Sequence, residues 1–232
     1  MISTFLSVKT SCKERILKVR QDLTVGRLSE LLKAHRSRLE RNDFMGIGYI
    51  CKLKRTLLKK ILLLSDTHGF LDQKIKSYCS KADEIWHAGD IGKSLVLDEL
   101  EALKPLRAVY GNIDSHQIRK QAPAFLSFSC EGVSVLILHI AGYPGRYNSQ
   151  AKKLIEIHRP QLVVCGHSHI LKVMQDKHYR HLHLNPGAAG ISGFHKVRTM
   201  LRFEIEQGKI QNLEAIELGL RGALSNTVNR TD

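Results

Sequence analysis

The stretch ILLLSDTHGF, residues 61–70, decides the fold because it joins four apolar residues almost directly to a carboxylate, an imidazole and a glycine. A short apolar run that ends in a turn is typical of a strand covered on both faces. Such a strand is held rigidly, so Asp66 and His68 beyond its end would be fixed in position. The stretch therefore predicts a buried first strand whose carboxyl end carries functional side chains.

The same rhythm continues along the chain. Four further runs rich in Ile, Val and Leu end in turn residues, at 84–86, 107–110, 133–140 and 162–165. Stretches that fit helices lie between the runs, at 72–80, 94–103 and 148–158. Shorter strands joined as hairpins are expected at 170–175, 180–184, 199–206 and 209–217. Alternating strands and helices predict a layered α/β sheet with ligands beyond the carboxyl ends of its strands.

Residues that can bind a metal ion accompany the end of each of the five apolar runs. In chain order they are Asp66 and His68, Asp90, Asn112, His139, and finally His167 and His169. This mixture of nitrogen and oxygen donors suits borderline divalent ions such as Mn²⁺, Fe²⁺, Zn²⁺ or Co²⁺, rather than Ca²⁺ or a thiolate-bound zinc. Singly, such an aspartate is more often a helix cap and such a histidine a packing residue. Their joint occurrence predicts a metal centre.

Other polar residues nearby keep two interpretations. His87 either hydrogen-bonds near Asp90 or packs in the core. Tyr143 and Arg146, shortly after His139, either contact a phosphate or belong to an ordinary loop. The remaining histidines are interpreted as surface or packing residues: His116, His158, His178, His181, His183 and His195.

Five motifs in a fixed order carry a family resemblance: D-x-H at 66–68, G-D at 89–90, G-N at 111–112, His139, and G-H-x-H at 166–169. Together they resemble the calcineurin-like metallophosphoesterases, most closely the small prokaryotic phosphodiesterases of the YfcE type. The resemblance covers about residues 61–218 and implies an α/β fold, a four-layer αββα sandwich, with a metallophosphoesterase domain at 58–220. The N-P-G loop within 185–190 also resembles a loop that lies near the site in that branch.

The resemblance also implies roles for the metal-binding residues. Asp66, His68 and His169 would hold the first ion, Asn112, His139 and His167 would hold the second, and Asp90 would bridge the two. Mn²⁺ is the expected ion, with Fe²⁺, Zn²⁺, Co²⁺ and Ni²⁺ as alternatives. Two such ions about 3.5–4 Å apart lower the pKa of a shared water, so that hydroxide can attack a phosphoester in line with its leaving oxygen.

One position departs from the family pattern. Many relatives have a histidine general acid after G-N, whereas this chain has Ile113. Water is then the default proton donor, and Asp114, the next residue, is a secondary candidate for the catalytic acid. The expected function is hydrolysis of small phosphodiesters rather than monoesters. The alternatives are a protein-binding scaffold with little activity, like the retromer scaffold subunit of this fold, and a nuclease.

The net charge of +14 is concentrated near the N-terminus, since residues 1–60 hold 15 Lys and Arg against 5 Asp and Glu. The remainder is only mildly basic, so nucleic acid is not the expected partner. Residues 1–57 are expected to be a basic extension, either with one amphipathic helix or from an over-extended gene start, and residues 221–232 a frayed tail. Five scattered cysteines, without a secretory signal or an apolar membrane span, predict a cytoplasmic protein. The sequence is compatible with either a monomer or a homo-oligomer.

Overall fold

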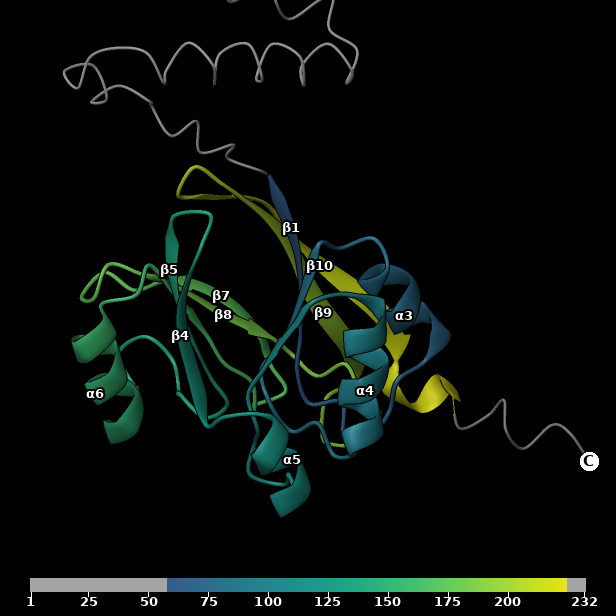
Figure 1. Ribbon diagram of the computed structural model, residues 1–232. Coiled ribbons are helices and arrows are strands. Elements are labelled where there is room, and N and C mark those ends of the chain that lie inside the picture. The colour runs from purple at the N-terminus through teal and green to yellow at the C-terminus, as the bar shows by residue number, and fades with distance from the viewer. Residues whose placement is uncertain (1–57, 225–232) are drawn as a thin grey trace, which may run out of the picture. The chain divides into compact units, whose positions relative to one another are not determined.

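The computed structural model describes residues 58–224 (Figure 1). The predicted basic extension at 1–57, with its amphipathic helix, lies outside the described residues. The first four residues of the predicted frayed tail form a short 3-10 helix, η2 (Arg221–Leu224), and the rest of that tail is again outside the described range. The predicted boundaries between the three parts of the chain therefore stay predictions.

Two five-stranded sheets form the centre of the described region. From edge to edge, the first consists of β10 (Lys209–Leu220), β9 (Val197–Glu206), β1 (Lys59–Leu64), β2 (Glu84–His87) and β3 (Leu106–Ala108). The second consists of β4 (Phe125–Cys130), β5 (Val133–Leu138), β6 (Leu162–Val164), β8 (Leu182–Pro186) and β7 (Leu171–Gln175). In each sheet three adjacent strands are parallel, namely β1, β2 and β3 in the first and β5, β6 and β8 in the second.

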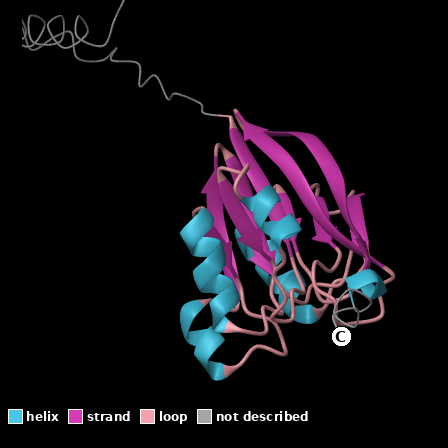
Figure 2. Ribbon diagram, turned by 90° about the vertical axis from the view of Figure 1, so that its right-hand side faces the viewer, coloured by secondary structure: helices cyan, strands magenta, loops and turns pink. Residues whose placement is uncertain are grey.

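Helices complete the layers. Two of them, α3 (Gln73–Cys79) and α4 (Ser94–Leu103), lie beside the first sheet, and α6 (Ser149–His158) lies beside the second (Figure 1). A short helix, α5 (His116–Gln121), follows β3. The order helix, sheet, sheet, helix confirms the predicted four-layer αββα sandwich, and loops gather at one end of the strands (Figure 2). Among residues 58–224, no helix is long and apolar enough to cross a membrane.

The alternation of side chains along β1 explains why this strand is apolar on both sides. Leu62 and Leu64 belong to the hydrophobic cluster shared with α3 and α4, whereas Ile61 and Leu63 belong to the cluster between the two sheets. Successive residues of a strand point to opposite faces, so a strand in a middle layer buries both sets. The predicted buried strand is thus confirmed.

Backbone hydrogen bonds align the turns that follow β1 and β2. The parallel register brings both strands to an end at the same level. Beyond the strands, Asp66 N donates to Gly89 O over 2.9 Å, and His68 N donates to Asp90 O over 3.0 Å. The D-x-H turn and the G-D turn therefore run side by side. Their side chains lie close together beyond the carboxyl ends of β1 and β2.

Two elements were missed from sequence. Strand β4 pairs with β5 through a tight turn at Glu131 and Gly132, whose φ angles are 44° and 89°. Its alternation of polar and apolar residues, FLSFSC, suits an edge strand and was available in the sequence. Helix α5 has six residues, too few to show a helical period. Strands β9 and β10 are also longer than predicted.

Replacing Leu63 by Ala is expected to lower the free energy of unfolding by about 2–5 kcal/mol. The Leu63 side chain is 0% exposed between the two sheets, so its removal leaves a cavity. Urea denaturation followed by circular dichroism measures the loss. Leu95→Ala, on α4 and 59% exposed, is the matched control and should cost less than about 1 kcal/mol. Equal losses in the two variants would contradict the position assigned to Leu63.

Candidate metal centre

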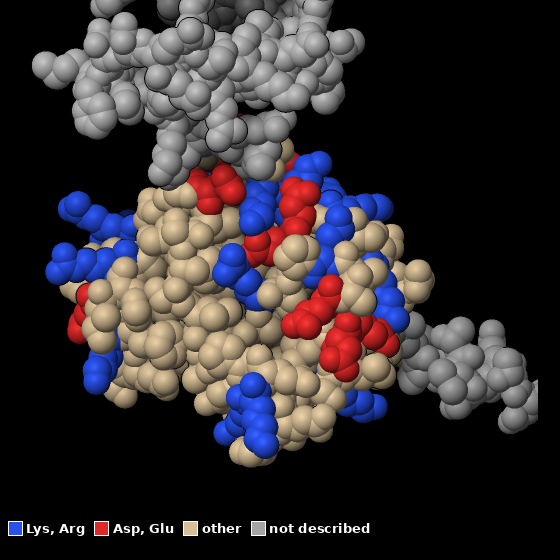
Figure 3. Space-filling view, viewed as in Figure 1, with Lys and Arg blue, Asp and Glu red and all other residues tan. Residues whose placement is uncertain are grey.

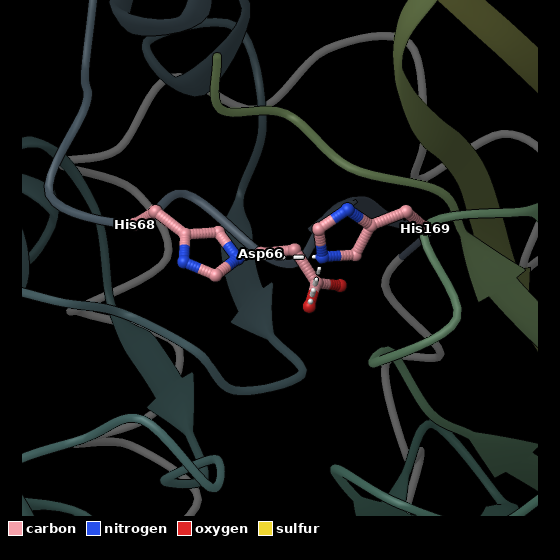
Figure 4. A group of neighbouring side chains, drawn as sticks. All are labelled: Asp66, His68 and His169. Atoms are coloured by element: carbon pink, nitrogen blue, oxygen red, sulfur yellow. Dashed lines mark hydrogen bonds and ion pairs between the residues drawn. The ribbon is translucent and has the colours of Figure 1, made fainter. Parts of the chain in front are cut away.

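The first group of predicted metal ligands lies where the end of β1 meets the loop after β6. Asp66, His68 and His169 each offer a donor atom, and these atoms lie within 4.8 Å of one another (Figure 4). His169 Nε2 is 3.3 Å from both His68 Nε2 and Asp66 Oδ1. Three donors that converge from different parts of the chain fit a divalent cation with nitrogen and oxygen ligands.

The second group lies beside the first. Asp90, His139 and His167 also offer donors within 4.8 Å of one another. His139 Nε2 is 3.2 Å from Asp90 Oδ1 and 3.1 Å from Asn112 Oδ1, so the amide oxygen of Asn112 joins this group. All seven residues predicted as ligands are therefore brought together.

Asp90 lies between the two groups. Its Oδ1 faces His139 Nε2 at 3.2 Å, while its Oδ2 faces His68 Nε2 at 3.8 Å. Burial by itself would raise the pKa of the Asp90 carboxyl, but the hydrogen bond and charge of His139 outweigh it and lower the pKa. A carboxylate that presents one oxygen to each side can serve two ions at once.

The backbone adopts a rare conformation at five of the seven residues. The φ angles are positive, between 49° and 69°, at Asp66, His68, Asp90, His167 and His169. Residues other than glycine seldom adopt this left-handed region, and such strain is typically found at functional sites. Glycine is needed where the turns meet: a Cβ at Gly111 would lie 2.1 Å from Asp90 Oδ1. The predicted ligands are thus held in turns whose backbone is rare for residues other than glycine.

Hydrogen bonds orient the imidazole of His139. Its Nδ1 donates to Ala88 O over 2.8 Å, which leaves Nε2 with a lone pair directed at the centre. Burial by itself would lower the pKa of His139, but the hydrogen bond and charge of Asp90 raise it above the usual value. An ion bound at Nε2 would replace the proton there, so a cation competes with the proton that Asp90 stabilises.

His195 supports His169 in the same way, and sequence analysis missed it. His195 Nε2 donates to Gly190 O over 3.1 Å, so its Nδ1 is the acceptor that faces His169 Nδ1 at 3.3 Å. His169 then donates from Nδ1 and keeps the lone pair of Nε2 for the centre. The 190–195 loop makes this contact, and no spacing in the sequence indicates it.

His87 and Asp114 join neighbouring turns of the centre through hydrogen bonds. Burial lowers the pKa of His87 to about 4, so this imidazole is neutral, with Nδ1 accepting from Gly89 N and Nε2 bonding Thr67 Oγ1 over 2.9 Å. Asp114 is buried and accepts three backbone N–H bonds. Its oxygens are engaged in joining the G-D turn to the G-N turn. This geometry favours a structural role, and its predicted role as a catalytic acid stays a prediction.

The fold and this centre define the class of protein. The domain model of the calcineurin-like phosphoesterase superfamily matches residues 60–208, and the chain belongs to this superfamily. A probable metallophosphoesterase from Methanothermobacter thermautotrophicus is 28% identical over 133 residues, which are 54% of this chain and 74% of that relative. The family predicted from the motifs is confirmed.

Solved structures agree on the fold. A predicted phosphoesterase from Streptococcus pneumoniae matches with a TM-score of 0.51 and 18% identity, covering 69% of this chain and 98% of the other. Vps29 from Entamoeba histolytica, complexed with Zn²⁺, matches with a TM-score of 0.53 and 15% identity, covering 68% and 98%. Vps29 from Chaetomium thermophilum gives 0.55 and 15%, covering 69% and 97%. At these identities the matches concern the fold alone.

Replacing His195 by Ala is expected to weaken Mn²⁺ binding roughly 10–100-fold, because His169 loses the acceptor that holds its ring. Calorimetric titration of the metal-free chain with Mn²⁺ measures the affinity. His158→Ala, an exposed histidine at the end of α6, should leave it unchanged. Unchanged affinity in the His195 variant would show that the contact with His169 is incidental.

Proposed function

We propose that the chain is a phosphoesterase with two divalent metal ions and that small phosphodiesters are its substrates. Asp66, His68 and His169 would hold one ion, Asn112, His139 and His167 the other, and Asp90 both. The observation that carries this proposal is the position of Asp90, whose two oxygens face donors of different groups. A structural role alone would not require a buried carboxylate among four imidazoles.

Mn²⁺ is the expected ion, and Fe²⁺, Zn²⁺, Co²⁺ and Ni²⁺ suit the same donors. When bound, the two ions supply a water of lowered pKa and positive charge beside the phosphoryl oxygens. The Zn²⁺ complex of a Vps29 protein supports the view that this fold can hold a divalent ion. Only two of the seven donors are carboxylates, so the centre keeps net positive charge and attracts a phosphate anion.

The chain's own residues would orient the substrate and hold protons in place. Ala88 O and His195 keep the protons of His139 and His169 on Nδ1, away from the centre. Asp114 is engaged with backbone N–H groups, so water is the proton donor that we propose for the leaving group. Lys and Arg are scattered among Asp and Glu on the face shown in Figure 3, which favours a small substrate over nucleic acid.

The Vps29 matches support a second candidate, a protein-binding scaffold on the same fold. The two candidates differ in a simple assay. Purified full-length protein is mixed with bis(p-nitrophenyl) phosphate or p-nitrophenyl phosphate, with Mn²⁺ or with a chelator. A phosphodiesterase releases nitrophenol only with the ion and prefers the diester, whereas a scaffold gives no turnover that depends on the ion.

Asp90→Asn is expected to lower kcat for the diester by at least about 100-fold, because the residue proposed to bind both ions loses its negative charge. This loss should exceed the effect of removing a residue that only hydrogen-bonds to a ligand. Asp98→Asn, an exposed residue on α4, is the matched control and should keep full activity. Circular dichroism checks that both variants fold. Activity near that of the unmodified protein in the Asp90 variant would reject the bridging role.

We also propose that the catalytic domain begins near residue 58. Removing residues 1–57 is expected to keep the metal-dependent turnover, because β1 begins at Lys59 and all seven proposed ligands follow it. The assay above measures kcat for the shortened chain. A folded but inactive product would show that the extension takes part in the reaction.

A further inference from the structure

A cavity of about 330 Å³ adjoins the metal centre at His167. Its lining includes apolar, aromatic and basic side chains beside one proposed ligand: Ile140, Tyr143, Arg146, His167, Ile170 and Lys172. Because His167 belongs to the second group of proposed ligands, a phosphoester held there would direct an attached organic group into or past this cavity. Its volume lies at the small end of ligand pockets, which range over about 300–1,000 Å³.

Large apolar side chains form part of the wall of this cavity. Ile140 and Ile170 directly follow the proposed ligands His139 and His169, and they are 41% and 60% exposed. The two isoleucines come from different turns yet line the same cavity, together with Tyr143, which is 36% exposed. Large apolar side chains gathered around a polar site are typical of pockets that bind an organic ligand.

The charge of the cavity is positive. Arg146 and Lys172 contribute to its lining, and none of the described lining residues is Asp or Glu. Lys172 Nζ lies 4.0 Å from the centroid of the Tyr143 ring, a cation–π contact that holds the ring against the wall. The guest that suits this lining is an apolar ring attached to a negatively charged group, which describes an aryl phosphoester.

A second, smaller cavity of about 240 Å³ lies on the other side of Ile140. Its lining includes Asn112, Arg119 and His139. Ile140 is common to both cavities, so the two flank the second group of proposed ligands. A phosphodiester has two organic groups and a monoester has one; two adjoining cavities therefore favour a diester.

Resting on the proposed function, we infer that the larger cavity binds one ester group of a phosphodiester, and that this group is an aromatic ring. Tyr143, Ile140 and Ile170 would set the selectivity for the ring, and Arg146 and Lys172 would attract the anion. The smaller cavity would leave room for the second ester group.

Phenylphosphonate and methylphosphonate test the inference, because both carry the anion and only one carries a ring. Calorimetry with the Zn²⁺-loaded full-length protein should show phenylphosphonate binding roughly 10-fold or more tightly, as expected for burying a ring. In Tyr143→Ala and Ile170→Ser the ratio of the two affinities should fall to about 1–3. Ile157→Ser, an equally exposed isoleucine at 62% on α6, should keep the original ratio.

The outcomes separate the inference from the proposed function. If diesters are hydrolysed and methylphosphonate binds, but the ring adds no affinity or both variants keep the ratio, the inference is wrong and the function stands. Amide shifts of the phenylphosphonate complex should change at Gly142 and Ile170. Changes confined to Asn112 and Arg119 would place the ring in the smaller cavity and overturn the assignment. If neither phosphonate binds and no ion supports turnover, both proposals fail.

Discussion

Two buried carboxylates, Asp66 and Asp90, lie beyond the ends of neighbouring parallel strands, and the surrounding structure offsets the free energy of burying them. A buried charge costs several kcal/mol unless it is compensated. Part of the compensation is local, since His167 N donates to Asp66 and Ile113 N donates to Asp90. The imidazole nitrogens around the same point add electron pairs that can coordinate a metal ion. Carboxylate oxygens and imidazole nitrogens together therefore make this region suited to binding cations.

The rest of the fold fixes that region in space. Apolar residues on both faces of β1 anchor the strand between a helical layer and the second sheet. Hydrogen bonds from the D-x-H turn to the G-D turn then set the distance between Asp66 and Asp90. Left-handed backbone at five of the seven proposed ligands fixes the direction in which their Cα–Cβ bonds leave the turns.

Much of the fold and centre followed from sequence because the evidence was local. The run before Asp66 marked a strand with two covered faces, and the family motifs named all seven residues that the structure brings together. His195 could not be found in this way, since its contact with His169 depends on how a later loop returns to the centre. Asp114 illustrates the reverse limit: its position in the motif predicted chemistry, whereas its three N–H partners, one from each of three residues, indicate support of the backbone.

Each group of proposed ligands draws on both sheets. Asp66 and His68 follow β1 of the first sheet, while His169 follows β6 of the second; Asp90 follows β2, and His139 follows β5. Any sliding of one sheet against the other would therefore disturb both groups together. A cation held by either group would in turn link one sheet to the other.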